Sequence, residues 1–417
     1  MTARVAWFSP LPPTRSGIAE YSTDLLPHLE RRYTIETFDE RRAHDFVWKY
    51  RRHAYDLVVY QMGNAPCHDY MWAYLAAYPG LVVLHDARLH HARARQLLQA
   101  NRRDDYRHEF WYDHPDARKD AVEYAVEGLG GPIAYFWPMR RLVVKTARLI
   151  AVHNERVANE LRQENTDAAI DVIRMGVPAL GASDDARRTV RASCGIEDTA
   201  TVFAAFGKMT SEKRLIPIVR ALASLVAVGL DAHLVVVGDM GEAPGLRESI
   251  GPPLANRVHF VGYVAEDAVA TYLAAADVCL CLRWPTALET SASWLRCLAA
   301  GRATVVSDLA HTADVPSSVA LRVDLLNEDA SLAGAMRALA ANGELRRRIA
   351  RAGHEWWRAH HTIEAMTADY ARVLDRAMVR PAPIVIGLPR HAVDDYSEAA
   401  RTRTAPFDVR IDDCWRG

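Results

Sequence analysis

The sequence predicts an α/β protein of two domains, each built on a mainly parallel β-sheet. Short apolar runs of strand type alternate with helical stretches, which is the pattern of strand–helix–strand units. The same alternation starts again in the second half of the chain. A length of 417 residues also exceeds what one hydrophobic core holds, so two domains are expected.

Composition and charge exclude several classes of protein. The net charge of −1 gives no electrostatic basis for binding nucleic acid. No apolar run approaches the roughly 18 residues that span a bilayer, and the N-terminus lacks a signal-peptide pattern, so we expect a cytoplasmic protein. The six cysteines lack metal-site spacing, and Cys279 and Cys281 share one face of an expected strand, where packing roles are predicted.

Six strand-type runs are expected in a first domain that covers residues 1–180. They occupy residues 4–9, 34–38, 57–61, 81–85, 149–154 and 171–178. Residues 88–145 have helical tendency and are rich in charged and aromatic side chains. The polar stretch 182–188 suits neither core, so the domain junction is expected near 178–190.

Polar residues follow three of these strands. Ser16 and Gly17 stand where the first strand passes into a helix, a position at which backbone N–H groups bind phosphate. Asn64 follows the third strand, and the pair His85-Asp86 follows the fourth. Because the carboxyl ends of parallel strands line the ligand crevice, these residues are candidate site residues, with a structural histidine as the alternative for His85.

The helical stretch 88–145 carries a group of arginines with two interpretations. They favour either a solvated helix face or a basic face for an acidic acceptor or a membrane surface. The group consists of Arg88, Arg93, Arg95, Arg102 and Arg103.

Five strand-type runs are expected in a second domain that covers residues 190–375. They occupy residues 202–206, 233–238, 258–261, 278–282 and 303–307, and a helical region covers 332–378. The turns Gly238-Asp239 and Gly262-Tyr263 follow the second and third of these strands. Residues 376–417 form a tail rich in proline and charge, which is expected to fold back on the first domain.

The step from the strand 202–206 to the helix 215–228 is the main candidate site. Gly207 ends the strand, and Lys208 and Lys213 follow in a polar loop. Only five lysines occur in the chain, and two of them stand here. Two cations and a helix N-terminus at the carboxyl edge of a sheet favour an anionic ligand, while the alternative is an ordinary solvated turn.

A second polar loop, residues 284–293, precedes a helix that Gly301 ends. Its Glu289, Thr290 and Ser291 have two interpretations. They are either helix-capping groups or groups that hydrogen-bond the hydroxyls of a sugar.

Taken in order, these motifs resemble those of the family 4 glycosyltransferases over about residues 1–375. The resemblance implies the GT-B architecture, with two facing Rossmann-like domains and a cleft between them. It also implies transfer of a sugar from a nucleoside diphosphate sugar with retention of configuration. The motifs are Ser9-Pro-Leu-Pro-Pro with Ser16-Gly17, His85-Asp86, Gly207-Lys208 with Glu212-Lys213, Gly238-Asp239 and Gly262-Tyr263, with Lys208 in place of the usual arginine.

The resemblance assigns a role to each candidate. It implies that Ser16, Gly17, Gly207, Lys208 and Lys213 bind the donor diphosphate. It implies that Glu289, Thr290 and Ser291 bind the donor sugar, that Gly238, Asp239, Gly262 and Tyr263 bind the nucleoside, and that Asn64 and Asp86 lie on the acceptor side. The implied catalytic residues are His85, Lys208, Lys213 and Glu289. No metal and no bound cofactor are expected, and the acceptor is a saccharide, a lipid-linked saccharide or a small natural product.

One departure from the family pattern concerns its second glutamate, which usually holds the nucleotide ribose. By its two usual spacings it falls on Arg296 or Cys297, and neither is acidic. Two alternatives therefore stay open. One is a catalytically degenerate GT-B subunit that binds a nucleotide or acts as a scaffold, and the other is a GT-B sugar epimerase or phosphorylase.

Overall fold

The computed structural model describes residues 2–52, 55–129, 131, 133–181, 183–241 and 245–395. The chain forms two compact units. The first unit comprises Met1–Arg174, Ala287–Thr290 and the chain from Met366 onward, and the second comprises Met175–Thr286 and Ser291–Ala365. Residues 396–417 of the expected tail lie outside the described residues.

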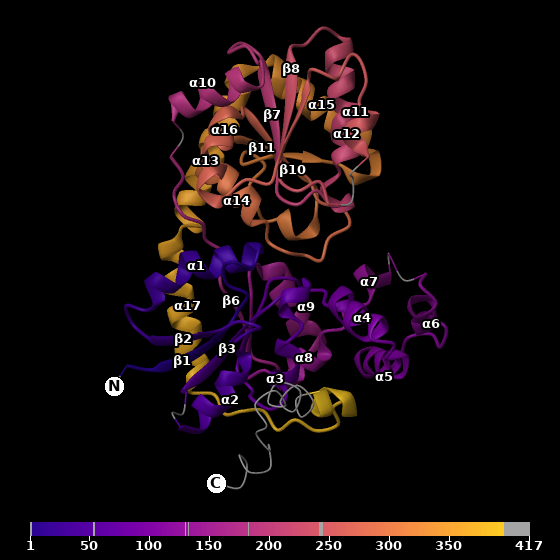
Figure 1. Ribbon diagram of the computed structural model, residues 1–417, viewed down its shortest axis with the longest axis vertical. Coiled ribbons are helices and arrows are strands. Elements are labelled where there is room, and N and C mark those ends of the chain that lie inside the picture. The colour runs from indigo at the N-terminus through magenta and orange to yellow at the C-terminus, as the bar shows by residue number, and fades with distance from the viewer. Residues whose placement is uncertain are drawn as a thin grey trace. The chain divides into compact units, whose positions relative to one another are not determined.

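The first unit contains a six-stranded parallel sheet with the order β2-β1-β3-β4-β5-β6 (Figure 1). Its strands are β1 (Arg4–Phe8), β2 (Thr34–Phe38), β3 (Leu57–Met62), β4 (Leu81–Leu84), β5 (Leu149–Val152) and β6 (Ile170–Val172). Side chains alternate between the two faces of β1, so Trp7 contacts Tyr370 and Phe8 contacts Phe46 and Tyr74. Both faces of β1 are therefore buried, as is usual for a parallel sheet covered by helices.

The helices of the first unit fall into two groups. Those around the sheet are α1 (Gly17–Leu29), α2 (Ala43–Arg52), α3 (Met71–Leu75), α8 (Arg141–Thr146), α9 (Glu155–Glu164) and α17 (Ile363–Met378). The others are inserted between β4 and β5: α4 (His90–Gln99), α5 (Arg103–Asp113), α6 (Ala121–Val126) and α7 (Ile133–Phe136). Figure 1 shows this second group gathered at one side of the unit, away from α1 and α17. It has an apolar core of its own around Tyr106 and Phe110.

The second unit contains another six-stranded parallel sheet, with the order β12-β11-β10-β7-β8-β9. Its strands are β7 (Thr201–Phe206), β8 (Ala232–Val237), β9 (Val258–Gly262), β10 (Val278–Cys281), β11 (Ala303–Ser307) and β12 (Leu321–Val323). The strand order reverses between β7 and β10, which is where an open α/β sheet binds its ligand. The predicted fold class, α/β with two parallel sheets, is confirmed.

Helices cover both faces of the second sheet. Figure 1 shows α10 (Asp184–Ser193), α13 (Glu266–Ala275) and α16 (Gly343–His360) on one side, and α11 (Leu215–Ala227), α12 (Leu246–Ser249) and α15 (Glu328–Ala341) on the other. The helix α14 (Ala292–Ala299) leads into β11. Among the described residues, no helix is both long and apolar enough to cross a bilayer.

The structure differs from the expected elements in three places. The strand expected at 171–178 ends at Val172, and the three-residue edge strand β12 was not expected. The helix α17 was expected in the second domain, but from Met366 onward the chain groups with the first unit. Its side chains explain the difference, because Asp369 pairs with Arg174 at 2.7 Å and Tyr370 accepts a hydrogen bond from Tyr21.

Candidate active site

Three strand ends of the second unit meet at the predicted glycine turns. The N–H of Gly207 donates to the carbonyl of Val237 at 2.9 Å, and the N–H of Gly238 donates to the carbonyl of Gly262 at 2.7 Å. Gly238 has φ of +135°, and a Cβ there would lie 2.1 Å from the carbonyl oxygen of Gly207. Only glycine therefore allows this close approach of the turns after β7 and β8.

The ammonium group of Lys213 lies directly over the end of β7. Its Nζ donates to the carbonyl of Phe206 at 2.6 Å, and a Cβ added to Gly207 would lie 2.9 Å from the same Nζ. The hydroxyl of Ser293, which was not among the predicted residues, is 3.8 Å from that Cβ position. The structure thus gathers a cation, a glycine backbone and a hydroxyl at the carboxyl edge of the sheet.

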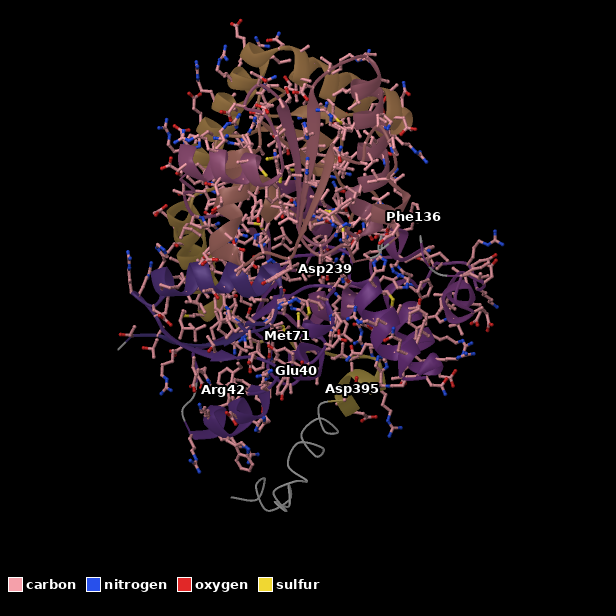
Figure 2. The ribbon with its side chains drawn as sticks, turned by 45° about the horizontal axis from the view of Figure 1, so that its top comes forward. Glu40, Arg42, Met71, Phe136, Asp239 and Asp395 are labelled. Atoms are coloured by element: carbon pink, nitrogen blue, oxygen red, sulfur yellow. The ribbon has the colours of Figure 1, made fainter. Side chains whose placement is uncertain are left out.

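The predicted nucleoside residues lie along the same edge. Asp239, labelled in Figure 2, follows β8 and is exposed, and its Oδ1 accepts the N–H of Gly241 at 3.1 Å. The carbonyl of Asp239 accepts the N–H of Met209 at 2.7 Å, and the exposed Lys208 lies with its carbon chain against Gly241. Tyr263 follows β9 and is also exposed. All the predicted diphosphate and nucleoside residues of the second unit are therefore neighbours in space.

The loop that carries the predicted sugar residues divides between the two units. Ser291 lies in the second unit and caps α14, with its Oγ accepting the N–H of Trp294 at 3.2 Å. Glu289 and Thr290 group with the first unit, where Asn154 Nδ2 lies 3.3 Å from Oγ1 of Thr290. One carboxylate oxygen of Glu289 accepts the N–H of Ala287 at 2.9 Å. The capping interpretation of Ser291 is thus observed, while sugar binding stays a prediction.

Neither residue at the position of the family's second glutamate presents a carboxylate. Arg296 forms an ion pair with Glu266 at 2.5 Å. Cys297 is buried, and its Sγ lies 3.8 Å from that of Cys281 in a cluster that also contains Cys279. The predicted packing role of Cys279 and Cys281 agrees with this cluster.

In the first unit, Ser16 and Gly17 form the N-terminus of the 13-residue helix α1. The Oγ of Ser16 caps the helix by accepting the N–H of Ile18 at 3.2 Å. A Cβ added to Gly17 would meet no atom within 4 Å, so the backbone here faces open space. The positive end of the helix dipole and the accessible backbone suit an anion.

His85 is part of a buried polar network rather than an exposed group. Its side chain follows β4 and the residue is only 7% exposed. Its Nε2 lies 2.7 Å from Oε1 of Gln61, and its Nδ1 lies 3.3 Å from Nε2 of His153. Burial, with a smaller contribution from His153, lowers the pKa of His85 well below its ordinary value. The ring is therefore neutral at pH 7, and a catalytic role for it stays a prediction.

Residues far apart in the sequence close this network, and sequence reasoning did not find them. Tyr21 meets His85 edge to face at 4.7 Å and donates to the hydroxyl of Tyr370 at 2.8 Å. The same hydroxyl lies 3.2 Å from Nε2 of Gln61. Gln61 could be suspected from the sequence because it is a polar residue near the carboxyl end of β3. No sequence pattern, however, connects it to a tyrosine on α17.

The predicted acceptor-side residues hold the turns after β3 and β4 together. Oδ2 of Asp86 accepts the N–H of Asn64 at 2.7 Å. The side chain of Asn64 donates to the carbonyl of Arg88 at 2.7 Å. Asn64 and Asp86 are thus brought together with His85 at one edge of the first sheet, and contact with an acceptor stays a prediction.

Comparison with known proteins agrees with this geometry. Residues 200–342 match the protein family described as "Glycosyl transferases group 1", and no curated protein matches the sequence. The structure resembles Anabaena Alr3699/HepE solved with UDP (TM-score 0.62, 15% identity, 90% of this chain and 100% of that chain). It also resembles sucrose-phosphate synthase (tll1590) from Thermosynechococcus elongatus (TM-score 0.64, 15% identity, 90% and 98%). A third similar structure is a glycosyltransferase from Rickettsia africae (TM-score 0.61, 11% identity, 91% and 100%).

At these identities the structural likeness shows the fold alone, which is GT-B, with two Rossmann-like domains. The family match lies in the second unit, where it covers β7, the Gly207–Lys213 loop and α14. Fold and matched domain together define the class of protein: a GT-B glycosyltransferase.

Proposed function

We propose that this chain is a retaining, metal-independent glycosyltransferase of the family 4 type. It moves a sugar from a nucleoside diphosphate sugar to an acceptor saccharide, lipid-linked saccharide or small natural product. One observation carries the proposal: the ammonium group of Lys213 lies over Gly207 at the end of β7, where the strand order of the second sheet reverses. The matched glycosyltransferase domain contains this loop.

The charge at this edge suits the leaving group of such a reaction. Breaking the glycosidic C–O bond leaves negative charge on the diphosphate and positive charge on the sugar. Lys208, Lys213 and the backbone N–H groups at Gly17 would stabilise the diphosphate without a metal. Cations that are held in place before the reaction starts typically contribute several kcal/mol to such a step.

The remaining predicted residues complete the proposed site. Glu289, Thr290 and Ser291 orient the hydroxyls of the sugar, and the turns at Gly238 and Gly262 approach the nucleoside. Both ring nitrogens of His85 already have a partner, Gln61 or His153. His85 can therefore act at the anomeric centre or on the acceptor only if one of these contacts is replaced by a contact with the substrate. Asn64 and Asp86 hold the turns after β3 and β4 in position on the acceptor side.

The first test is a thermal-shift screen against UDP, GDP, ADP and dTDP and their common sugars. A nucleotide that binds the folded state raises the unfolding midpoint by mass action. The HepE structures were solved with UDP and with UDP-glucose, which makes UDP the first nucleotide to examine. A folded protein that no nucleotide stabilises would favour the scaffold alternative.

The second test compares Lys213→Ala with Lys119→Ala, an exposed lysine of the first unit. Loss of one preorganised cation should lower the transfer rate by about 10²- to 10³-fold, whereas Lys119→Ala should not change it. Near-normal turnover of Lys213→Ala, with the protein folded, would remove this loop from the mechanism. Turnover of the nucleotide sugar without an acceptor would indicate an epimerase, and a requirement for free phosphate would indicate a phosphorylase.

A further inference from the structure

A pocket of about 500 Å³ opens in the first unit, between the inserted helices and the helices that cover the sheet. Residues from the ends of α5, α7 and α9, from the segments that follow α7 and α9, and from α8 line it. We call it the α5–α9 pocket. Its volume lies within the roughly 300–1,000 Å³ of small-molecule sites.

Part of the α5–α9 pocket lies at the amino edge of the first sheet, away from the edge at which we propose sugar transfer. Lys145 lies in the last turn of α8, just before β5, and residues 165–167 lie between α9 and β6. These segments run into the amino ends of their strands. The residues predicted to bind the substrates of the transfer follow the carboxyl ends of β1, β3 and β4, at the opposite edge of the same sheet.

Aromatic rings form part of the wall. Phe136, labelled in Figure 2, is 75% exposed although it lines the pocket. Trp137 follows it and meets His114 edge to face at 4.9 Å and Phe110 at 5.7 Å. The tryptophan is therefore held by the core of the inserted helices, while Phe136 offers a free apolar surface to a ligand.

Charged groups of both signs line the pocket in equal number: Arg140, Arg141, Lys145, Asp113, Glu164 and Asp167. The buried guanidinium of Arg140 is already neutralised, because it pairs with Glu160 at 2.7 Å and with Glu164 at 2.6 Å. Its Nη1 also donates to the carbonyl of Ala87 at 3.0 Å. The pocket therefore has little excess of positive charge that would select a phosphate or another anion.

The inner polar groups are suited to uncharged hydrogen-bonding partners. Burial raises the pKa of Asp113 to about 7, while burial and the nearby Arg140 and Arg141 lower that of His114 to about 4. Near neutral pH the imidazole is uncharged, and the carboxyl group is close to its own midpoint. Nε2 of His114 lies 3.3 Å from Oδ1 of Asp113 but is buried without a hydrogen bond.

From these observations we infer that the α5–α9 pocket is a binding site for a neutral saccharide. The ring of Phe136 packs against the C–H face of a pyranose, which is apolar. Asp113, His114 and the charged groups at the rim exchange hydrogen bonds with its hydroxyls. The inference does not depend on the proposed transfer reaction, since binding here needs neither the nucleotide nor the Gly207–Lys213 loop.

Saturation-transfer NMR on the full chain tests the inference. The probes are the methyl glycosides of glucose, galactose, mannose and N-acetylglucosamine in both anomeric forms, at tens of millimolar and without nucleotide. At least one should bind, and its signal should persist when saturating UDP is added. Phe136→Ala should weaken its affinity about five-fold, the usual loss for one aromatic contact. Because Phe136 is exposed, this change should leave the protein folded.

A control and a second test variant make the result decisive. Tyr124→Ala removes a ring that is 48% exposed on α6 and does not line the pocket, so it should leave the affinity unchanged. Asp167→Ala, at the exposed rim, should weaken binding. The inference is overturned if no glycoside binds, if Phe136→Ala and Tyr124→Ala behave alike, or if inorganic phosphate displaces the sugar. Since no transfer is measured, an inactive enzyme that binds the sugar still supports it.

Discussion

Replacing Gly238 by alanine tests whether the turns after β7 and β8 position the proposed diphosphate site. A Cβ at this residue would lie 2.1 Å from the carbonyl oxygen of Gly207, and real Cβ contacts essentially never fall below 3.0 Å. The carbonyl must therefore move by about 0.9 Å, from 2.1 to 3.0 Å. Because Lys213 Nζ lies over Gly207, this shift displaces the cation from its present position.

The size of the effect follows from two contributions. Alanine at positive φ costs about 1 kcal/mol or more in backbone strain. Displacing Gly207 also disturbs its hydrogen bond to the carbonyl of Val237, and a buried group left without its partner costs about 1–3 kcal/mol. We expect Gly238→Ala to lower the free energy of unfolding of the second unit by about 2–4 kcal/mol and to weaken nucleotide binding.

Gly229→Ala is the matched control. Gly229 has φ of +82°, but a Cβ there would meet no atom within 4 Å, so only the strain remains, about 1 kcal/mol. Urea unfolding followed by circular dichroism, with and without the nucleotide selected by the screen, measures both quantities. Equal losses of stability and equal stabilisation by nucleotide in the two variants would refute the reasoning.

Three further predictions concern the metal, the pH and the inserted helices. Transfer should continue in excess chelator, since the proposed charge stabilisation uses lysines, and strict dependence on a divalent metal would contradict it. Burial lowers the pKa of four histidines to about 4: His68, His90, His114 and His233. The unfolded chain takes up protons at these sites near pH 6.5 and the folded chain does not, so stability should fall between pH 6.5 and 4, by about 3 kcal/mol for a fully buried ring. The raised pKa of Asp113 has the opposite effect on stability, because the folded chain takes up a proton there before the unfolded chain does, but this involves only one group. A urea midpoint that stays constant between pH 6.5 and 4 would show that the histidine rings are not buried and neutral. Glu109→Gln breaks a buried pair with Arg93 at 2.6 Å that also contacts His391, and should cost about 3–5 kcal/mol. Glu123→Gln breaks an exposed pair with Arg107 and should cost far less in the same unfolding assay.

The strands and most of the candidate residues could be predicted because their signals are local. An apolar run such as 202–206 and the glycine and lysines after it show a strand, a turn and a cationic loop within a dozen residues. The parallel arrangement then brings the strand ends together, so Gly207, Gly238, Asp239 and Gly262 could be grouped without coordinates. The edge strand β12 was missed because three residues are too short for a periodic pattern.

Only the tertiary structure decided which polar groups are buried and which residues they contact. The sequence shows His85 at a strand end, but Tyr21, His153 and Tyr370 come from distant segments to enclose its network. In the same way, Phe136 and Asp113 belong to one pocket only because separate helices meet there. Local patterns determine where strands and turns form, whereas the exposure and the pKa of a side chain depend on what packs over it from elsewhere in the chain.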